Sequence, residues 1–343
     1  MDASDIRILS AASALPGPPV DNAALARRFG LDRLWEQWVD TFIGTGTRHL
    51  AVDLDSGEIT SSLVDLGAEA GRLALERAAL RSSDIDVIVF ASATPDALLP
   101  TTVNLVAERL GINDIPSYQL QSGCSGAYQA LALARQLLLA RDCRNALVLG
   151  GDVLVKHFDL TIDMSKLPPA ELVNMLLFGD GAGAAVLTRD KLPGTTALRR
   201  VVHRVTGEGR APGQSVEWFG LADRHLDKPA AQEDYKAIEE SVPLMSAEIV
   251  KEILDDLHWT EHEVDYLLPP QLSGKMAERV TETLNMSGAE EITCVRETAN
   301  TGNAVPFIQL ERVLPQMVGG DRALGITVES SKWIKAGFAL ERV

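Results

Sequence analysis

One cysteine of the chain occupies a position that suits covalent chemistry. Residues 119 to 129 read QLQSGCSGAYQ, so Cys124 lies between two glycines, after a strand-like run and before a helix-like run. A nucleophile needs such glycines, because its backbone must turn sharply and a substrate must approach closely. A buried structural cysteine does not need them. The pattern predicts a nucleophilic thiol, and the alternative is a small core cysteine at a strand–helix junction.

The other two cysteines follow a different pattern. Cys143 stands at the end of a predicted helix, and Cys294 lies in the strand-like run EITCV. Three widely spaced cysteines fit neither a disulfide framework nor a zinc site. We therefore expect Cys143 and Cys294 to be structural, and we expect no metal.

The elements that must position Cys124 alternate between strands and helices. Short apolar runs typical of buried strands occupy residues 86–92, 145–151, 184–187 and 264–268. Helical patterns occupy residues 63–80, 125–140 and 236–257. This alternation indicates an α/β fold.

Composition excludes several classes of protein. With 343 residues the chain is long enough for two domains and a large core. Its net charge of -16 argues against nucleic acid as a partner, since a phosphate backbone requires a basic surface. No apolar run reaches membrane-spanning length, and the start MDASDIRIL lacks the pattern of a signal peptide. These features predict a cytoplasmic protein with no membrane partner.

Three segments of the first half have counterparts, in the same order, in the second half. The pairs are residues 82–95 and 261–272, 117–138 and 291–314, and 144–152 and 322–330. We interpret them as a duplicated α/β fold, with residues 1–190 as the half that carries Cys124 and residues 191–343 as the other half. Loops at equivalent strand ends converge in such a fold. Cys124, the loop 269–273 and the turn around Asn300 should therefore meet.

Several strings together resemble the thiolase superfamily, and in particular its β-ketoacyl-ACP synthase III branch. They are TPDALLPTTVNLVAERLG, QSGCSGAYQALALA, GGDVL, LLFGDGAGAAVL and ANTGNAVP, and the resemblance covers nearly the whole chain. It implies a duplicated thiolase fold with five layers, αβαβα. It also implies a homodimer and an active-site cysteine that carries an acyl group as a thioester.

The physical chemistry of Cys124 agrees with that role. The start of the helix that ends near Ala140 places it where the helix dipole and free N–H groups favour a thiolate. The backbone N–H of Cys124 can help to hold the oxyanion of an attacked thioester. Cys124 is thus the predicted acyl carrier.

The resemblance assigns two further catalytic positions, and one of them has changed. Condensing members carry a histidine within a Pro-His-Gln-Ala-Asn string, whereas this chain reads LLPPQLSG. Pro270 stands in place of the histidine, Gln271 matches the glutamine, and Ser273 stands in place of the asparagine. Asn300 matches the second catalytic position. Gln271 and Asn300 are therefore candidate catalytic residues, and Pro270 and Ser273 are candidates for substrate binding.

The loss of the histidine weakens decarboxylative condensation. In that reaction the histidine and asparagine together stabilise an enolate, and proline has no side-chain donor and no N–H. One lost donor to a developing oxyanion costs about 3 kcal/mol. Near the C-terminus, Glu329 and Ser330 replace residues of a glycine-rich run in the family and are candidates for a base or donor. The alternative for them is a surface turn.

The resemblance also bears on the acyl donor. Trp38 matches a tryptophan that stacks on coenzyme A, but Phe42 and Gly46 stand where arginines are usual, which favours an acyl carrier protein over acyl-CoA. Lys275 and Arg279 could form a basic docking surface for such an acidic carrier, or a solvated helix face. Leu99 matches a position that lines the acyl pocket of the partner subunit. No cofactor is expected besides acyl-ACP or acyl-CoA as substrate.

Three functions fit the sequence. The first is an acyltransferase that forms an acyl thioester on Cys124 and passes the acyl group to an amine, a hydroxyl or a carrier thiol. Its pathway would be one of natural-product or fatty-acid-related metabolism. The second is a decarboxylative condensing enzyme with an atypical active site. The third is a non-catalytic partner subunit of another ketosynthase, which would have no need for Cys124.

Overall fold

The structure is a computed structural model that describes residues 6–140, 143–157, 177–217, 225 and 231–343. Its main feature is a mixed sheet of ten strands in the order β12-β11-β13-β14-β8-β1-β7-β6-β4-β5. From each edge inwards, the first three strands pair in parallel, and each of the next two strands pairs antiparallel with the strand before it. The order of strand types is thus the same from both edges, as expected for a duplicated fold. The two halves join where β1 pairs with β8.

The strands of the first half are β1 (Ile6–Ala14), β4 (Val87–Ala91), β5 (Ser117–Leu120), β6 (Asn145–Asp152) and β7 (Gly181–Thr188). Those of the second half are β8 (Thr196–Val205), β11 (Tyr266–Leu268), β12 (Glu290–Glu291), β13 (Arg322–Glu329) and β14 (Ile334–Arg342). Every residue of β4, β6 and β7 is buried, because helices cover both faces of this part of the sheet. Such strands are continuous apolar or small-residue runs.

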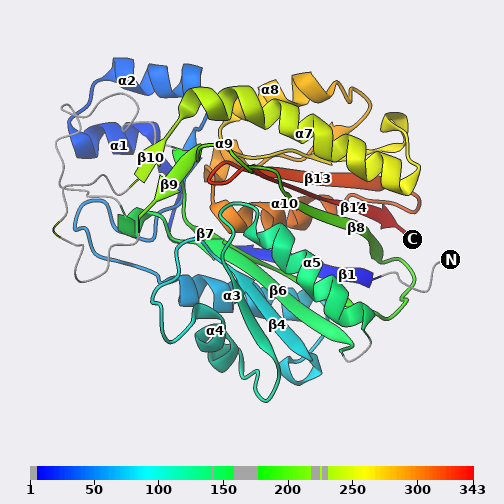
Figure 1. The fold of residues 1–343 in the computed structure, drawn as a ribbon. Helices are drawn as coiled ribbons and strands as arrows, with labels where there is room; N and C mark the ends of the chain where they lie inside the picture. The colour runs from blue at the N-terminus through cyan, green and yellow to red at the C-terminus, as the bar shows by residue number, and fades with distance from the viewer. Residues whose placement is uncertain (1–5, 141–142, 158–176, 218–224, 226–230) are drawn as a thin grey trace.

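Helices lie in three layers around the two halves of the sheet (Figure 1). One outer layer contains α3 (Leu63–Arg77) and α4 (Thr102–Leu110), and the other contains α7 (Tyr235–Leu257) and α8 (Gly274–Leu284). Between the halves lie α5 (Gly126–Leu139) and α10 (Val305–Val313). The α/β class predicted from the sequence is confirmed, and the layers follow the order αβαβα.

The central helix α5 begins next to Cys124 and contacts β4 and β6 on one side and β8 and β14 on the other. Its buried residues include Ala127, Ala130 and Ala134, which let strands approach closely on both sides. Tyr128 fills the remaining space and stacks on Phe338 of β14, with ring centroids 5.3 Å apart. Packing on both sides thus holds the start of α5 in place.

Smaller elements complete the fold. They are β2 (Val20–Asp21), α1 (Asn22–Phe29), α2 (Arg33–Trp38), β3 (Thr47–Arg48), β9 (Gln214–Val216), β10 (Ala231–Glu233) and α9 (Val295–Thr298). Among the described residues, no helix is both long and apolar enough to cross a membrane. The predicted boundary between residues 190 and 191 lies in the connection from β7 to β8, and it stays a prediction.

Candidate active site

Cys124 lies at a tight corner between β5 and α5. Gly123 has a φ of +49°, a left-handed conformation that glycine adopts without strain. Gly126 lies against Asn303, whose Oδ1 accepts a hydrogen bond from the N–H of Ala127 at 2.8 Å. A residue of the second half therefore satisfies the first turn of the helix that follows the cysteine.

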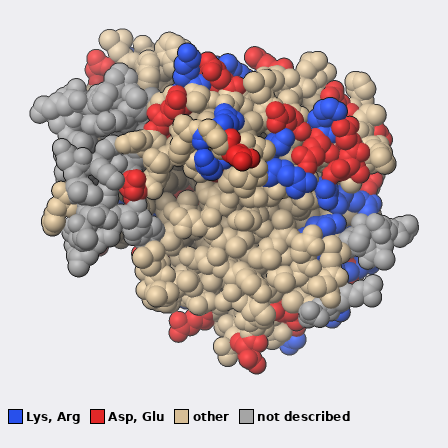
Figure 2. Space-filling view, viewed as in Figure 1, with Lys and Arg blue, Asp and Glu red and all other residues tan. Residues whose placement is uncertain are grey.

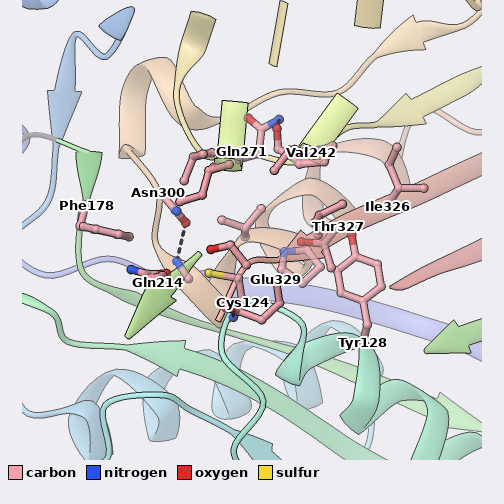
Figure 3. Close-up of a pocket in the computed structure, with 18 residues that line it drawn as sticks. Cys124, Tyr128, Phe178, Gln214, Val242, Gln271, Asn300, Ile326, Thr327 and Glu329 are labelled. Atoms are coloured by element: carbon pink, nitrogen blue, oxygen red, sulfur yellow. Dashed lines mark hydrogen bonds between the residues drawn. The ribbon is translucent and has the colours of Figure 1, made fainter. Parts of the chain in front are cut away.

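A single pocket collects Cys124 and most of the predicted site residues (Figure 3). Besides Cys124 they are Pro270, Gln271, Asn300, Glu329 and Ser330. The hollow holds about 630 Å3 of space, its open mouth included. The convergence expected for Cys124, the loop 269–273 and Asn300 is thus present. The remaining walls are largely apolar: Tyr128, Phe178, Ile238, Val242, Leu272, Val305, Pro306, Ile326 and Val328.

Asn300 presents a hydrogen-bond donor to this pocket. Its Oδ1 accepts the N–H of Gly302 at 3.0 Å, which identifies the oxygen and leaves the NH2 group facing the pocket. The backbone of Asn300 is held as well, because its N–H donates to the carbonyl of Leu177 at 2.9 Å. The side chain is therefore oriented to donate to a substrate oxygen.

Gln271 has a different role from the one predicted. Its Oε1 accepts the N–H groups of Cys294 and Val295 at 2.8 and 3.0 Å, and its Nε2 donates to the carbonyl of Pro269 at 2.9 Å. Both ends of the amide are thus engaged with backbone, so the catalytic role predicted for Gln271 does not fit this geometry. The residue fixes the loop that brings Pro270 to the pocket. Pro270 itself offers no donor there.

Glu329 provides the main polar contact of Cys124. It is the last residue of β13, and its side chain is only 2% exposed. Its Oε2 accepts a hydrogen bond from the backbone N–H of Cys124, and its Oε1 accepts the N–H of Ser331 at 2.7 Å. The N–H that we expected to hold an oxyanion therefore already has a carboxylate as its acceptor.

The surroundings of the Cys124 thiol oppose ionisation. Burial raises the pKa of this thiol well above its ordinary value, and the negative charges of Glu329 and Asp152 raise it further. A third carboxylate, Glu233, acts in the same direction with a smaller effect. The expectation that the helix start yields a thiolate is therefore wrong for the resting protein, because the nearest charges are negative.

Two polar groups of the site escaped prediction. Gln214 of β9 lines the pocket, and its Nε2 donates to Glu233 of β10 at 2.8 Å. His203 of β8 lies near the corner at Cys124, with its Nε2 3.3 Å from the hydroxyl of Ser125 and 3.4 Å from that of Ser122. Neither residue belongs to a motif, and only the pairing of distant strands brings them to the corner.

Three residues predicted to bind substrate lie elsewhere. Ser273 is the N-cap of α8, where its hydroxyl accepts the N–H of Met276 at 3.1 Å, so it caps a helix and does not line the pocket. Trp38 ends α2 and is half-buried beside Phe42, with ring centroids 6.3 Å apart. Leu99 is 82% exposed on this chain. The predictions for Trp38 and Leu99 therefore concern surfaces outside the pocket.

The predicted docking residues are ion-paired with neighbouring acids. Lys275 pairs with Glu278 at 2.8 Å, and Arg279 pairs with Glu239. On the face seen in Figure 2, basic and acidic groups are likewise interspersed. In the second half of the chain, Arg200 also pairs with Asp256, Arg204 with Glu252 and Lys335 with Glu248. Carrier docking at Lys275 and Arg279 stays a prediction, and these pairs reduce the positive charge available for it.

Known proteins share both the sequence and this architecture. A family model described as 3-oxoacyl-[acyl-carrier-protein (ACP)] synthase III matches residues 118–204. A β-ketoacyl-[acyl-carrier-protein] synthase III of Neisseria meningitidis serogroup A is 28% identical over 306 residues, which are 87% of each chain. The solved structure of AbyA1, a tetronic acid condensing enzyme, is 59% identical with a TM-score of 0.96. That match covers 98% of this chain and 99% of the other.

The chain belongs to the β-ketoacyl-ACP synthase III-like branch of the thiolase superfamily. A 3-oxoacyl-(acyl carrier protein) synthase III of Pseudomonas aeruginosa, 23% identical, has the same fold with a TM-score of 0.83 over 98% of each chain. The duplicated thiolase fold with five layers is thereby confirmed. These relatives are synthases and condensing enzymes, so the family places the chain among enzymes.

Proposed function

We propose that this protein forms an acyl thioester on Cys124 and transfers the acyl group to the hydroxyl of a second substrate. The observation that carries the proposal is that Cys124 and Asn300 line one pocket, and that Pro270 lines the same pocket. A thiol and a donor suffice for thioester exchange, whereas enolate formation by decarboxylation needs more donors. Acyl-ACP is the proposed donor and acyl-CoA its substitute, and we propose a homodimer as the working form.

The 59% identity to a tetronic acid condensing enzyme suggests the products. A tetronic acid is a five-membered lactone with an enolised 3-oxo group, so its ring requires one new ester C–O bond and one new C–C bond between two acyl units. A 3-oxoacyl thioester and a 2-hydroxyacyl thioester contain the required atoms. We propose these two classes of thioester as the substrates.

The chemistry then balances in two steps. The hydroxyl attacks the 3-oxoacyl carbonyl on Cys124, which forms the ester and releases the Cys124 thiolate, and the hydroxyl proton passes to that sulfur. The carbon between the ketone and the new ester loses a proton and attacks the carbonyl of the 2-hydroxyacyl thioester. The second thiolate leaves and takes up a proton. Two thioesters thus give one ring and two thiols.

This route explains why Pro270 is tolerated. The attacking carbon lies between two carbonyl groups, which acidify it without loss of carbon dioxide. A histidine that stabilises the enolate formed by decarboxylation is therefore dispensable. Decarboxylative condensation, the second candidate, needs that enolate and lacks a donor at Pro270 worth about 3 kcal/mol.

The test is the intact mass of the protein after incubation with 3-oxoacyl, simple acyl and malonyl thioesters of coenzyme A and of carrier protein. We expect a mass increase that is absent in Cys124→Ala and retained in the control Cys143→Ala, whose cysteine is buried away from the pocket. A chase with a 2-hydroxyacyl carrier should remove the acyl group and yield a lactone. Release of carbon dioxide from a malonyl thioester would favour condensation instead. If no donor gives an adduct, the proposal is wrong and the partner-subunit function gains support.

A further inference from the structure

Glu329 is a buried carboxylate fixed by its own strand and turn. Among the described residues it forms no ion pair with a lysine, arginine or histidine, although it is only 2% exposed. Its hydrogen-bond donors are the backbone N–H groups of Cys124 and Ser331. Buried carboxylates are usually balanced by a cation or by many donors. Glu329 thus retains acceptor capacity beside the thiol.

The corner at Cys124 is shaped to admit this carboxylate. A Cβ added to Gly123 would overlap Oε2 and the carboxyl carbon of Glu329. Any other residue at position 123 would therefore displace the carboxylate, in addition to straining the left-handed backbone. Glycine at position 123 is therefore required both by the turn and by the space that the Glu329 carboxylate occupies.

The turn that follows Glu329 is anchored from behind. Trp333 ends it at a φ of +56° and is 2% exposed, and its Nε1 donates to the carbonyl of Ala211 at 2.7 Å. The guanidinium of Arg210 covers the indole at 3.8 Å. A bulky residue in the left-handed region costs about 1–2 kcal/mol, so packing must hold it there. The backbone on both sides of Glu329 is therefore fixed.

The thiol of Cys124 lies in the same pocket as this carboxylate, and the charge of Glu329 raises the pKa of the thiol. The same carboxylate therefore accepts the backbone N–H of Cys124 and acts on the thiol of that residue. Two requirements of catalysis conflict with that arrangement, because the thiol must lose its proton and the N–H must become available to a substrate oxygen. Transfer of the thiol proton to the carboxylate would meet both requirements.

We infer that Glu329 is the general base of the acyl-transfer reaction, and that by accepting the proton of Cys124 it also releases the Cys124 N–H for the oxygen of the thioester. This inference rests on the proposed acyl transfer. The S–H bond breaks and an O–H bond forms on Glu329, while the thiolate forms a bond to the acyl carbon. A neutral carboxylic acid is a weaker acceptor than a carboxylate, so the hydrogen bond from the N–H to Glu329 weakens and the N–H can donate to the new oxyanion instead.

The proton then leaves with the carrier. When the tetrahedral intermediate collapses, the bond from the acyl carbon to the carrier sulfur breaks. Glu329 returns its proton to that sulfur and regains its charge. In the second half-reaction the carboxylate accepts the proton of the attacking hydroxyl and passes it to the departing Cys124 sulfur. No outside acid or base is required.

Other titratable groups near the corner are less well placed. Asp152 lies on β6 and accepts hydrogen bonds from both the backbone and the side chain of Asn303. Glu233 of β10 holds Gln214. His203 of β8 contacts the hydroxyls of Ser122 and Ser125. Of these groups, only Glu329 bonds Cys124 itself.

The test compares Glu329→Gln with wild type in two assays, both read by intact mass. The first is alkylation of Cys124 by iodoacetamide as a function of pH. Loss of the carboxylate charge should move the alkylation midpoint to lower pH and speed alkylation at neutral pH. The second is single-turnover acylation by an acyl thioester, which should slow by about 100-fold or more. A variant with a more reactive thiol and slower acyl transfer is the signature of a lost base.

Controls separate this outcome from structural damage. Glu248→Gln removes one exposed charge on α7 and should match wild type in both assays. Glu329→Asp keeps the charge at a shorter reach and should acylate faster than Glu329→Gln. His203→Ala tests the alternative base. Thermal unfolding of each variant verifies folding, and the pH midpoint of alkylation does not depend on stability.

Each result has one meaning. If Glu329→Gln acylates at the wild-type rate, or leaves the alkylation midpoint unchanged, the inference is overturned while the proposed function stands. If His203→Ala alone slows acylation, the base is the histidine. If wild type accepts no acyl group from any donor, the proposed function fails and the base role fails with it.

Discussion

Two buried carboxylates, Asp152 and Glu329, occupy equivalent places in the two halves of the molecule. Each is the last residue of its strand, β6 in the first half and β13 in the second. Each crosses to the other half and lies against a glycine with positive φ: Gly302 for Asp152 and Gly123 for Glu329. Each accepts the N–H of the residue after that glycine, Asn303 or Cys124.

The two carboxylate–glycine contacts differ in the side chain that follows the glycine. At Asp152 it is Asn303, whose Nδ2 donates a second hydrogen bond at 2.8 Å. Ser92, Thr94 and the N–H of Ala93 supply further donors to the same carboxylate. At Glu329 the side chain is the Cys124 thiol, which can give up its proton. Asp152, whose donors are all fixed, therefore joins the two halves. Glu329 has fewer donors and lies beside a thiol, so it is available for chemistry.

The largest expected effect is on stability, at Asp152. Asp152→Ala removes the acceptor of several buried donors, each of which costs about 1–3 kcal/mol when left unsatisfied. We expect the free energy of unfolding to fall by about 3 kcal/mol or more, measured by thermal and urea unfolding. Glu329→Ala should cost less, since it deprives only two N–H groups of an acceptor. Equal losses of stability in Asp152→Ala and Glu329→Ala would refute the distinction between the two carboxylates.

Substitution of the two glycines, Gly302 and Gly123, should likewise cost more stability on the Asp152 side than on the Glu329 side. In Gly302→Ala and Gly123→Ala the new methyl group meets the opposing carboxylate, and the left-handed backbone alone costs about 1–2 kcal/mol. We expect Gly302→Ala to lose more stability, because Asp152 is held by many partners. Gly123→Ala should fold, with Glu329 displaced and Cys124 alkylated faster at neutral pH. Unfolding curves and alkylation rates check the pair, and a Gly123→Ala thiol as slow as wild type would contradict the contact with Glu329.

The pH dependence of stability provides a further test. The pKa of the Cys124 thiol is raised in the folded protein, so the unfolded chain releases this proton first as the pH rises. The contribution of Cys124 is therefore fully present below the unfolded pKa near 8.5. It is lost above that pH at up to about 1.4 kcal/mol per pH unit. Cys124→Ala should flatten this slope between pH 8.5 and 10.5 in urea unfolding, and an unchanged slope would count against a raised thiol pKa.

The smallest expected effect comes from giving position 124 the side chain that follows the equivalent glycine in the other half. Cys124→Asn places an amide where Asn303 stands in the other half, and this amide can donate to Glu329. A hydrogen bond to a charged group contributes about 1.5–3 kcal/mol, reduced here by imperfect fit, so we expect Cys124→Asn to exceed Cys124→Ala by about 1 kcal/mol in stability. Neither variant should carry an acyl group. A Cys124→Asn protein less stable than Cys124→Ala would show that the two corners are not equivalent.

Much of the fold and the position of Cys124 at a tight corner could be predicted from sequence, because those features have local signals. Apolar runs and helical periodicity identify strands and helices, and glycines on both sides of Cys124 mark a corner that admits a substrate. The duplicated order of segments placed Asn300 and the loop 269–273 near that corner, where the structure has them. Ser273 and Gln271 were misjudged. Their local strings suit a pocket, but their hydrogen bonds go to a helix start and to backbone.

The state of the thiol was decided by the tertiary structure alone. A helix start after Cys124 favours a thiolate as far as local sequence is concerned. The group that accepts the Cys124 N–H is 205 residues away along the chain, at the end of β13. Electrostatic and hydrogen-bonding effects on a pKa depend on distance in space and on exclusion of water. The sequence thus determined which residue carries the sulfur, and the packing of one half against the other determined which group can take its proton.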